Sequence, residues 1–213
     1  MSDSRKDRPG KLSCLDLFAG LGGMGLGARR FGEVVLAVDQ SPHSKAAHKE
    51  NSLADFVCKD LCSIPDDTLM KLEADIWLAS PPCQPYSTKG KQSDLDDPRA
   101  RSIPWLAESI GRRLPAGILL ENVPPFGKSR ARELLVSTLE RSGYAFQEVL
   151  LCPTELGIPN RRRRYYLLAL LGASPKFSLK EGRAPMRPLG SYLEESTDSA
   201  LQLSSDTVAR YSD

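Results

Sequence analysis

The sequence predicts an α/β protein with a doubly wound, mostly parallel sheet. Short apolar runs, typical of strands, alternate along the chain with polar segments of helical periodicity. A glycine-rich turn, residues 19–27, directly follows the first apolar run, and the second run ends at Asp39. Glycines let a backbone approach a nucleotide, and an acid at the tip of the second strand is typical of ribose binding. These features predict a ligand site at the carboxyl ends of the strands.

The expected strands and helices follow one another in a regular order. The predicted strands are residues 12–18, 33–39, 56–59, 76–80, 117–120, 146–151 and 165–171. The predicted helices are a short one that ends at Phe31, then residues 41–51, 66–73, 103–114 and 129–142. Ser41 suits an N-cap, Pro104 suits a first helical turn, and Gly143 suits a carboxyl cap.

Length and composition indicate a globular protein with one sizeable domain. The chain has 213 residues, of which 40% are hydrophobic and 26% charged, so it can bury a core. A net charge of +2 is too small to indicate a nucleic-acid binder, so any basic surface must be local. No apolar run is long enough to span a membrane, and residues 1–11 lack the apolar core of a signal peptide. An intracellular protein of the cytoplasm or nucleus is therefore expected.

The five cysteines are odd in number and show no framework spacing, so reduced thiols are expected. Cys58 and Cys62, with His43 and His48 upstream, could form a zinc site, but their spacings fit none of the usual patterns. No metal is therefore expected.

Cys83 lies in the run Ser-Pro-Pro-Cys-Gln-Pro, directly after the predicted fourth strand. The two prolines cannot donate hydrogen bonds to a sheet, so the strand should end there. The thiol is then expected on a loop at the carboxyl edge of the sheet. From this loop alone, a catalytic nucleophile and an incidental buried cysteine are both possible.

Six stretches, in order and spacing, resemble the cytosine-C5 methyltransferase family. They are residues 16–23, Asp39, Asp60, residues 82–84, residues 121–123 and residues 160–164. The resemblance implies the Rossmann-like fold of S-adenosyl-L-methionine (SAM)-dependent methyltransferases, with SAM as cofactor and a nucleic acid as partner. It covers residues 12–172.

The resemblance also implies roles for individual residues. Cys83 would add to C6 of cytosine, and Glu121 would hydrogen-bond the ring N3 and amino group. Arg162 and Arg164 align with the two arginines of the family's Gln-x-Arg-x-Arg element and would hold the cytosine carbonyl and a nearby phosphate. The implied cofactor site consists of Phe18, Ala19, Gly20, Gly22, Gly23, Asp39, Asp60 and Pro81. The alternatives are a surface acid for the glutamate and a solvated patch or nuclear signal for the arginines.

Three stretches resemble more closely the eukaryotic-type subfamily that methylates cytosine in the anticodon loop of aspartate tRNA. They are residues 80–87, 97–99 and 151–160, where Asn160 replaces the glutamine usual in DNA-type enzymes. Pro124 and Pro125 depart from the Lys-Gly usual in the subfamily. A tRNA substrate is favoured, and DNA is the alternative.

The chain is expected to comprise a disordered tail (residues 1–11), a SAM-binding catalytic domain (12–172), and a linker with the start of an incomplete target-recognition region (173–213). Full-length family members continue with a recognition domain and a helix that completes the SAM pocket. Neither is recognisable in this sequence. A truncated, catalytically weak SAM-binding protein that needs a partner is therefore a second hypothesis.

Overall fold

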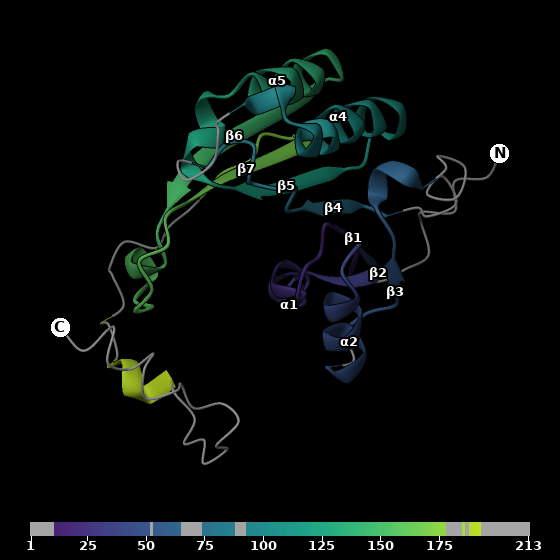
Figure 1. Cartoon of the computed structure of the whole chain (residues 1–213). Helices are drawn as coiled ribbons and strands as arrows, with labels where there is room; N and C mark the ends of the chain where they lie inside the picture. The colour runs from purple at the N-terminus through teal and green to yellow at the C-terminus, as the bar shows by residue number, and fades with distance from the viewer. Residues whose placement is uncertain are drawn as a thin grey trace.

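In the computed structural model, the described residues are 11–51, 53–64, 74–87, 93–177, 185 and 188–192. They form a seven-stranded sheet with the order β3-β2-β1-β4-β5-β7-β6 (Figure 1). The strands are β1 (Leu12–Leu17), β2 (Gly32–Asp39), β3 (Phe56–Cys58), β4 (Ile76–Ala79), β5 (Gly117–Asn122), β6 (Tyr144–Leu151) and β7 (Arg164–Leu171). Every predicted strand is confirmed, and β7 alone pairs antiparallel with its neighbours β5 and β6.

The α-helices within these residues are α1 (Gly23–Ala28), α2 (Pro42–Glu50), α4 (Ser102–Arg113) and α5 (Arg130–Arg141). Ser41 caps α2, since its hydroxyl accepts the Ser44 N–H at 3.4 Å. Ser129 caps α5 in the same way, and Gly143 follows that helix with a φ of +81°. The predicted helix at residues 66–73 lies outside the described residues. None of the described helices combines the length and apolar character that a membrane span requires.

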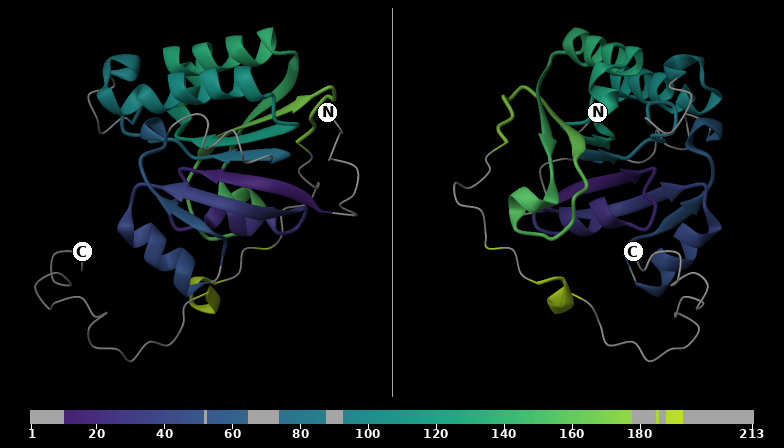
Figure 2. Two further views of the ribbon diagram at one scale, coloured as in Figure 1. Left: turned by 90° about the vertical axis from the view of Figure 1, so that its right-hand side faces the viewer. Right: turned by 60° about the vertical axis from the view of Figure 1, so that its left-hand side comes forward.

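The helices cover both faces of the sheet, with α4 and α5 on one face and α1 and α2 toward the other (Figures 1 and 2). The larger hydrophobic core joins the sheet to α4 and α5. Its fully buried side chains include Leu15, Leu17, Ile103, Leu106, Ile110, Ile118, Leu120, Leu135 and Leu139. The core against α1 is much smaller, with Cys14, Ala28 and Leu78 as its buried members. Each large core side chain contributes roughly 1.5–3 kcal/mol by its burial, so the sheet is anchored mainly from the α4–α5 face.

Candidate active site

The carboxyl ends of three adjacent strands meet at one edge of the sheet. Leu17 of β1 pairs with Ala79 of β4, which pairs in turn with Leu120 of β5. The glycine-rich turn, the cysteine loop and Glu121 follow these three positions directly. Because β7 runs antiparallel to β5, its first residue, Arg164, lies at the same edge. The topology therefore brings together motifs that are more than a hundred residues apart in the chain.

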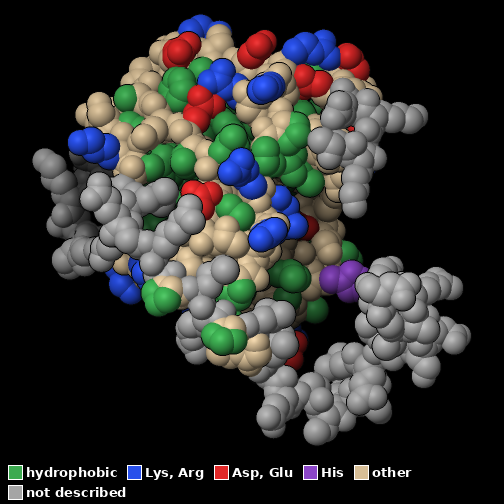
Figure 3. All heavy atoms as spheres, turned by 90° about the vertical axis from the view of Figure 1, so that its left-hand side faces the viewer, with side chains coloured by type: hydrophobic (Ala, Val, Ile, Leu, Met, Phe, Trp, Pro, Cys, Tyr) green, Lys and Arg blue, Asp and Glu red, His purple; other side chains and the backbone are tan. Residues whose placement is uncertain are grey.

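A cleft of about 620 Å³ opens at this edge. The predicted catalytic residues Cys83, Glu121, Arg162 and Arg164 all line it. The predicted cofactor residues Phe18, Gly20, Asp39, Asp60 and Pro81 line the same cleft. Figure 3 shows Lys and Arg side chains gathered in the middle of this face of the molecule. The remaining predicted cofactor residues Ala19, Gly22 and Gly23 do not line the cleft but belong to the turn that supports it.

Glu121 is the last but one residue of β5, and it faces the arginine segment, residues 161–164. Its Oε1 is 3.0 Å from Nε of Arg164, and both side chains are largely shielded from solvent. Burial raises the pKa of Glu121, while the positive charges of Arg164 and Arg162 oppose that rise. A raised pKa favours the protonated carboxyl group, which can donate a hydrogen bond to a ring nitrogen.

Asn122 fixes the cysteine loop from the neighbouring strand. Its Nδ2 donates to the carbonyl of Pro81 at 3.2 Å, and its Oδ1 accepts the Val123 N–H at 2.8 Å. The side chain is buried, so both of its polar ends need these partners. Cys83 then begins a tight turn in which its carbonyl accepts the Tyr86 N–H at 3.1 Å. The position of the thiol relative to Glu121 is therefore set by a direct contact between the two motifs.

The glycine-rich turn is shaped by left-handed backbone conformations and by Asp39. Phe18 and Gly20 have φ values of +57° and +52°. One carboxylate oxygen of Asp39 accepts the Gly20 N–H at 3.0 Å, and the other accepts the Ser41 N–H at 2.8 Å. Gly22 has a φ of +88°, a left-handed conformation that other residues rarely adopt, so glycine is favoured there. Asp39 thus fixes the turn and still presents unshared lone pairs toward the cleft.

Asp60 is held from two directions. Its Oδ1 accepts the Cys62 N–H at 3.0 Å, and its Oδ2 forms an ion pair with Arg101. Arg101 ends the 3-10 helix η4 (Pro98–Arg101), which packs against α4. Arg101 and Arg99 both line the cleft. The sequence offered a signal for Arg99 alone, the subfamily resemblance at residues 97–99, and none for Arg101.

The cofactor side of the cleft fits a nucleoside such as that of SAM. Asp39 offers carboxylate oxygens to ribose hydroxyls, and Phe18 and Pro81 provide apolar walls. A Cβ added at Gly20 would meet no atom within 4 Å, so the cleft is open beside the backbone there. Within the described residues, no three His, Cys, Asp or Glu side chains form a group that could hold a metal ion.

Comparison with known proteins gives a family match along nearly the whole chain. Residues 12–212 match the family of C-5 cytosine-specific DNA methylases. The human tRNA (cytosine(38)-C(5))-methyltransferase is 39% identical over 170 residues, which cover 77% of this chain and 44% of the human protein. A DNA (cytosine-5)-methyltransferase of Dictyostelium discoideum is 32% identical over 181 residues, which cover 81% of this chain and 48% of that protein. The chain thus spans less than half the length of these curated relatives.

Among solved structures, the Entamoeba histolytica methyltransferase EhMeth superposes with a TM-score of 0.81 and 26% identity. The superposition covers 95% of this chain and 66% of that one. Fold and sequence therefore agree, and this chain belongs to the C-5 cytosine-specific DNA methylase family.

Proposed function

We propose that the protein transfers a methyl group from SAM to C5 of cytosine in tRNA. The observation that carries this proposal is a single cleft lined by Cys83, Glu121 and Arg164 on one side and by Asp39 and Asp60 on the other. Residues 12–172 are the proposed catalytic domain, in agreement with a sheet that begins at Leu12 and ends at Leu171. Residues 173–213 are the proposed linker and start of a target-recognition region.

When bound, SAM supplies the methyl group that cytosine accepts. Asp39 would hold the ribose hydroxyls, and Asp60 would face the adenine amino group. Phe18 and Pro81 would exclude water from the cofactor, since both contribute apolar surface to the cleft. The glycine turn allows close approach of the backbone.

Cys83 provides the nucleophile, because C5 of cytosine is too electron-poor to take a methyl group unaided. The Sγ thiolate forms a bond to C6, and the ring electrons then make C5 nucleophilic. A bond from C5 to the methyl group would form as the bond from that group to the sulfur of SAM breaks, which would leave the sulfur as a neutral thioether. After transfer, the C5 proton leaves to a base, the C6–S bond breaks, and the thiolate is restored. Proton and electron pair therefore balance over the cycle, and the cysteine is unchanged.

Glu121 and the two arginines would stabilise charge that develops on the ring. A protonated Glu121 donates to N3 as the electron pair of the C5–C6 double bond shifts toward that nitrogen. Arg162 and Arg164 would hold the C2 carbonyl and the phosphate of the target nucleotide. A stacked and paired base cannot reach a cleft at a sheet edge, so the cytosine must be flipped out or already unpaired.

A tRNA substrate is favoured by Asn160 and by the human relative, whose name specifies tRNA. DNA is the second candidate, supported by the name of the Dictyostelium discoideum relative. A SAM-binding protein that needs a partner for catalysis is the remaining alternative.

The test compares labelled methyl transfer from SAM to a tRNA transcript that contains cytosine 38 and to duplex DNA. We expect label in the tRNA, and none in a matched transcript with uridine at position 38. Label in DNA alone would contradict the tRNA assignment. SAM binding without transfer to either nucleic acid would favour the partner-dependent alternative.

A further inference from the structure

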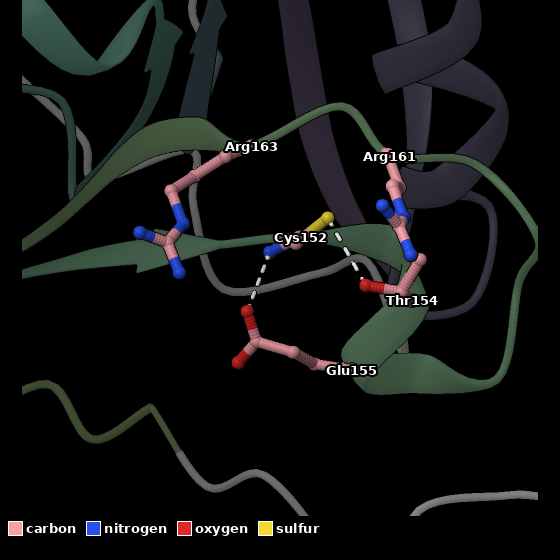
Figure 4. Close-up of a pocket in the computed structure, with 5 residues that line it drawn as sticks. All are labelled: Cys152, Thr154, Glu155, Arg161 and Arg163. Atoms are coloured by element: carbon pink, nitrogen blue, oxygen red, sulfur yellow. Dashed lines mark hydrogen bonds between the residues drawn. The ribbon is translucent and has the colours of Figure 1, made fainter.

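A second hollow, of about 440 Å³, lies beside the arginine segment and is separate from the cleft (Figure 4). It is lined by Cys152, Thr154, Glu155, Arg161 and Arg163. We propose that this hollow binds the backbone phosphate of the tRNA strand next to the target cytosine. This inference rests on the proposed function, because it assigns a further contact to the same substrate.

Successive residues of the arginine segment line the two cavities in turn. Arg162 and Arg164 line the cleft, whereas Arg161 and Arg163 line the hollow. Side chains of an extended chain point alternately to opposite sides, and Arg164 is the first residue of β7. A nucleic-acid strand whose base enters the cleft therefore has guanidinium groups on both sides of this segment.

The hollow has the chemistry that a phosphate requires. In Figure 4, Arg161 and Arg163 reach into it from the two sides of Cys152, and Thr154 adds a hydroxyl. Guanidinium groups present planar forks of N–H donors that match phosphate oxygens. Both arginines are exposed, so a strand can reach them without a change in the core.

Glu155 does not neutralise the pair. Its Oε1 accepts the backbone N–H of Cys152 at 3.0 Å and so caps the 3-10 helix η6 (Pro153–Leu156). No ion pair within the described residues joins Glu155 to Arg161 or Arg163. The carboxylate thus shapes the loop, and among the described residues that line the hollow two side chains are positively charged and one is negatively charged. Two guanidinium groups that have no carboxylate partner among the described residues suit an anionic ligand rather than a structural role.

Phosphate contacts in the hollow and base contacts in the cleft would have the different roles that they have in other nucleic-acid-binding proteins. Contacts to phosphates set position and affinity, while contacts to the base set specificity. Arg161 and Arg163 lie away from the reacting ring, so they act as positioning residues. Their loss should weaken tRNA binding and leave the chemical step largely intact.

The first test measures tRNA binding and turnover by the double variant R161Q/R163Q at several salt concentrations. Each phosphate contact contributes about 0.7 to the slope of log K against log salt for a single strand. We expect the magnitude of the slope to fall by about 0.7 if the arginines share one phosphate and by about 1.4 if they contact two. Affinity should fall about three- to tenfold, because exposed charges are screened, and kcat/KM should fall through KM.

The matched control is K45Q/K49Q, which removes the same charge from exposed positions of α2. That helix packs on the edge strand β3, at the opposite end of the sheet order from β6. We expect its salt slope and KM to equal those of the unmodified chain. An equal effect of both double variants would show a general charge effect and would overturn the hollow as a site.

The second test uses Cys152 as a reporter that needs no activity. The Thr154 hydroxyl donates to its Sγ at 3.2 Å and lowers the pKa of the thiol, which favours alkylation. We expect tRNA to slow the reaction of Cys152 with iodoacetamide, measured by peptide mass spectrometry, in the unmodified chain and not in R161Q/R163Q. The chain could methylate tRNA while tRNA does not protect Cys152 and R161Q/R163Q binds tRNA as the unmodified chain does. That result would overturn the phosphate site in the hollow and leave the proposed function in place. If the unmodified chain neither binds nor methylates tRNA, both are wrong.

Discussion

In the cofactor half of the cleft, carboxylates accept backbone N–H groups, whereas in the base half side chains connect neighbouring strands. The residues proposed to hold the cofactor, Phe18, Gly20, Asp39 and Asp60, make up the cofactor half, and those proposed to act on the base, Cys83, Glu121, Arg162 and Arg164, make up the base half; all of them line the cleft. Asp39 holds two backbone N–H groups of its turn. By contrast, Asn122 reaches across to the Pro81 carbonyl, and Arg164 reaches across to Glu121.

The packing behind the cleft is shared by the two halves. The helices α4 and α5 bury a large apolar cluster that includes Leu15 and Leu17 of β1 as well as residues of β4 and β5, whereas the cluster against α1 is small and includes Leu78 of β4. Both halves therefore have packed strands behind them, and the shape of the cofactor half depends in addition on the carboxylate that holds the backbone of its turn. Substitutions in the base half should change rate with little change in stability, whereas those in the cofactor half should change both.

The largest effect is expected for Cys83→Ser in the base half. Cys83 is not part of the hydrophobic core, so the variant should unfold at the same temperature as the unmodified chain. A serine hydroxyl is not ionised near neutral pH, so methyl transfer should fall by about 10⁴-fold or more. RNA with 5-fluorocytosine at the target should trap the unmodified protein covalently, because the fluorine cannot leave as a proton does, and should not trap the variant.

Cys62→Ser is the matched control, since Cys62 lines the same cleft. Burial raises the pKa of its thiol, which disfavours the reactive thiolate. We expect the Cys62→Ser protein to be trapped as the unmodified chain is. Equal trapping of Cys83→Ser and Cys62→Ser would remove Cys83 as the nucleophile.

The next largest effect, a change in stability, is expected for a substitution of Asp16, the residue of β1 that lies beneath the glycine-rich turn. Its Oδ2 accepts the Gly25 N–H at 3.1 Å, and its buried Oδ1 has no partner among the described residues. Burial raises the pKa of Asp16 from 3.8 to about 7. The folded state therefore retains a proton that the unfolded state loses. As far as Asp16 is concerned, the free energy of unfolding is highest below pH 3.8 and falls as the pH rises to about 7.

Asp16→Asn should abolish that loss. At about 1.4 kcal/mol for each pH unit between the two pKa values, the variant should gain on the order of 4 kcal/mol relative to the unmodified chain between pH 4 and 8. Urea unfolding at several pH values measures the difference. Asp55→Asn, at an exposed position, is the control and should show no such trend. A difference that is flat with pH would mean that Asp16 is charged in the folded protein.

The sequence was sufficient for the strands and for the motifs that follow them. Apolar runs and prolines are local signals, and parallel strands must bring Cys83 and Glu121 to one edge. It was not sufficient for contacts between distant loops. Asp60 and Arg101 are 41 residues apart, and Asp94 accepts N–H groups of α5 from 36 and 37 residues away. Such contacts depend on how loops pack after the sheet has formed, which no local pattern records.

A smaller effect is expected for Asp39→Ala in the cofactor half. The alanine leaves the Gly20 and Ser41 N–H groups without their acceptor and removes the proposed ribose contact. SAM binding should weaken by about 1–3 kcal/mol, the cost of unpaired hydrogen-bonding groups. Titration calorimetry measures the affinity, and thermal unfolding without SAM separates damage to the turn from loss of the ribose contact. Asp39→Asn retains one acceptor, so its SAM affinity should lie between those of the unmodified chain and Asp39→Ala. Unchanged affinity in Asp39→Ala would place Asp39 outside the site.

The smallest effect is expected for Arg101→Gln. Whether SAM binding becomes stronger or weaker in this variant shows whether Arg101 itself contacts the cofactor. The Arg101 side chain is 64% exposed and that of Asp60 is 28% exposed, so their ion pair should contribute less than about 1 kcal/mol to stability. The Cys62 N–H already holds the other oxygen of Asp60, so the carboxylate should stay in place without the arginine. Arg101 then competes with the proposed adenine contact, and its removal should strengthen SAM binding about two- to fivefold at low salt, with less gain at high salt. Calorimetry at two salt concentrations measures this. If Arg101→Gln weakens SAM binding instead, Arg101 contacts the cofactor directly, and the cofactor half would depend on a side chain from η4 as the base half depends on Asn122.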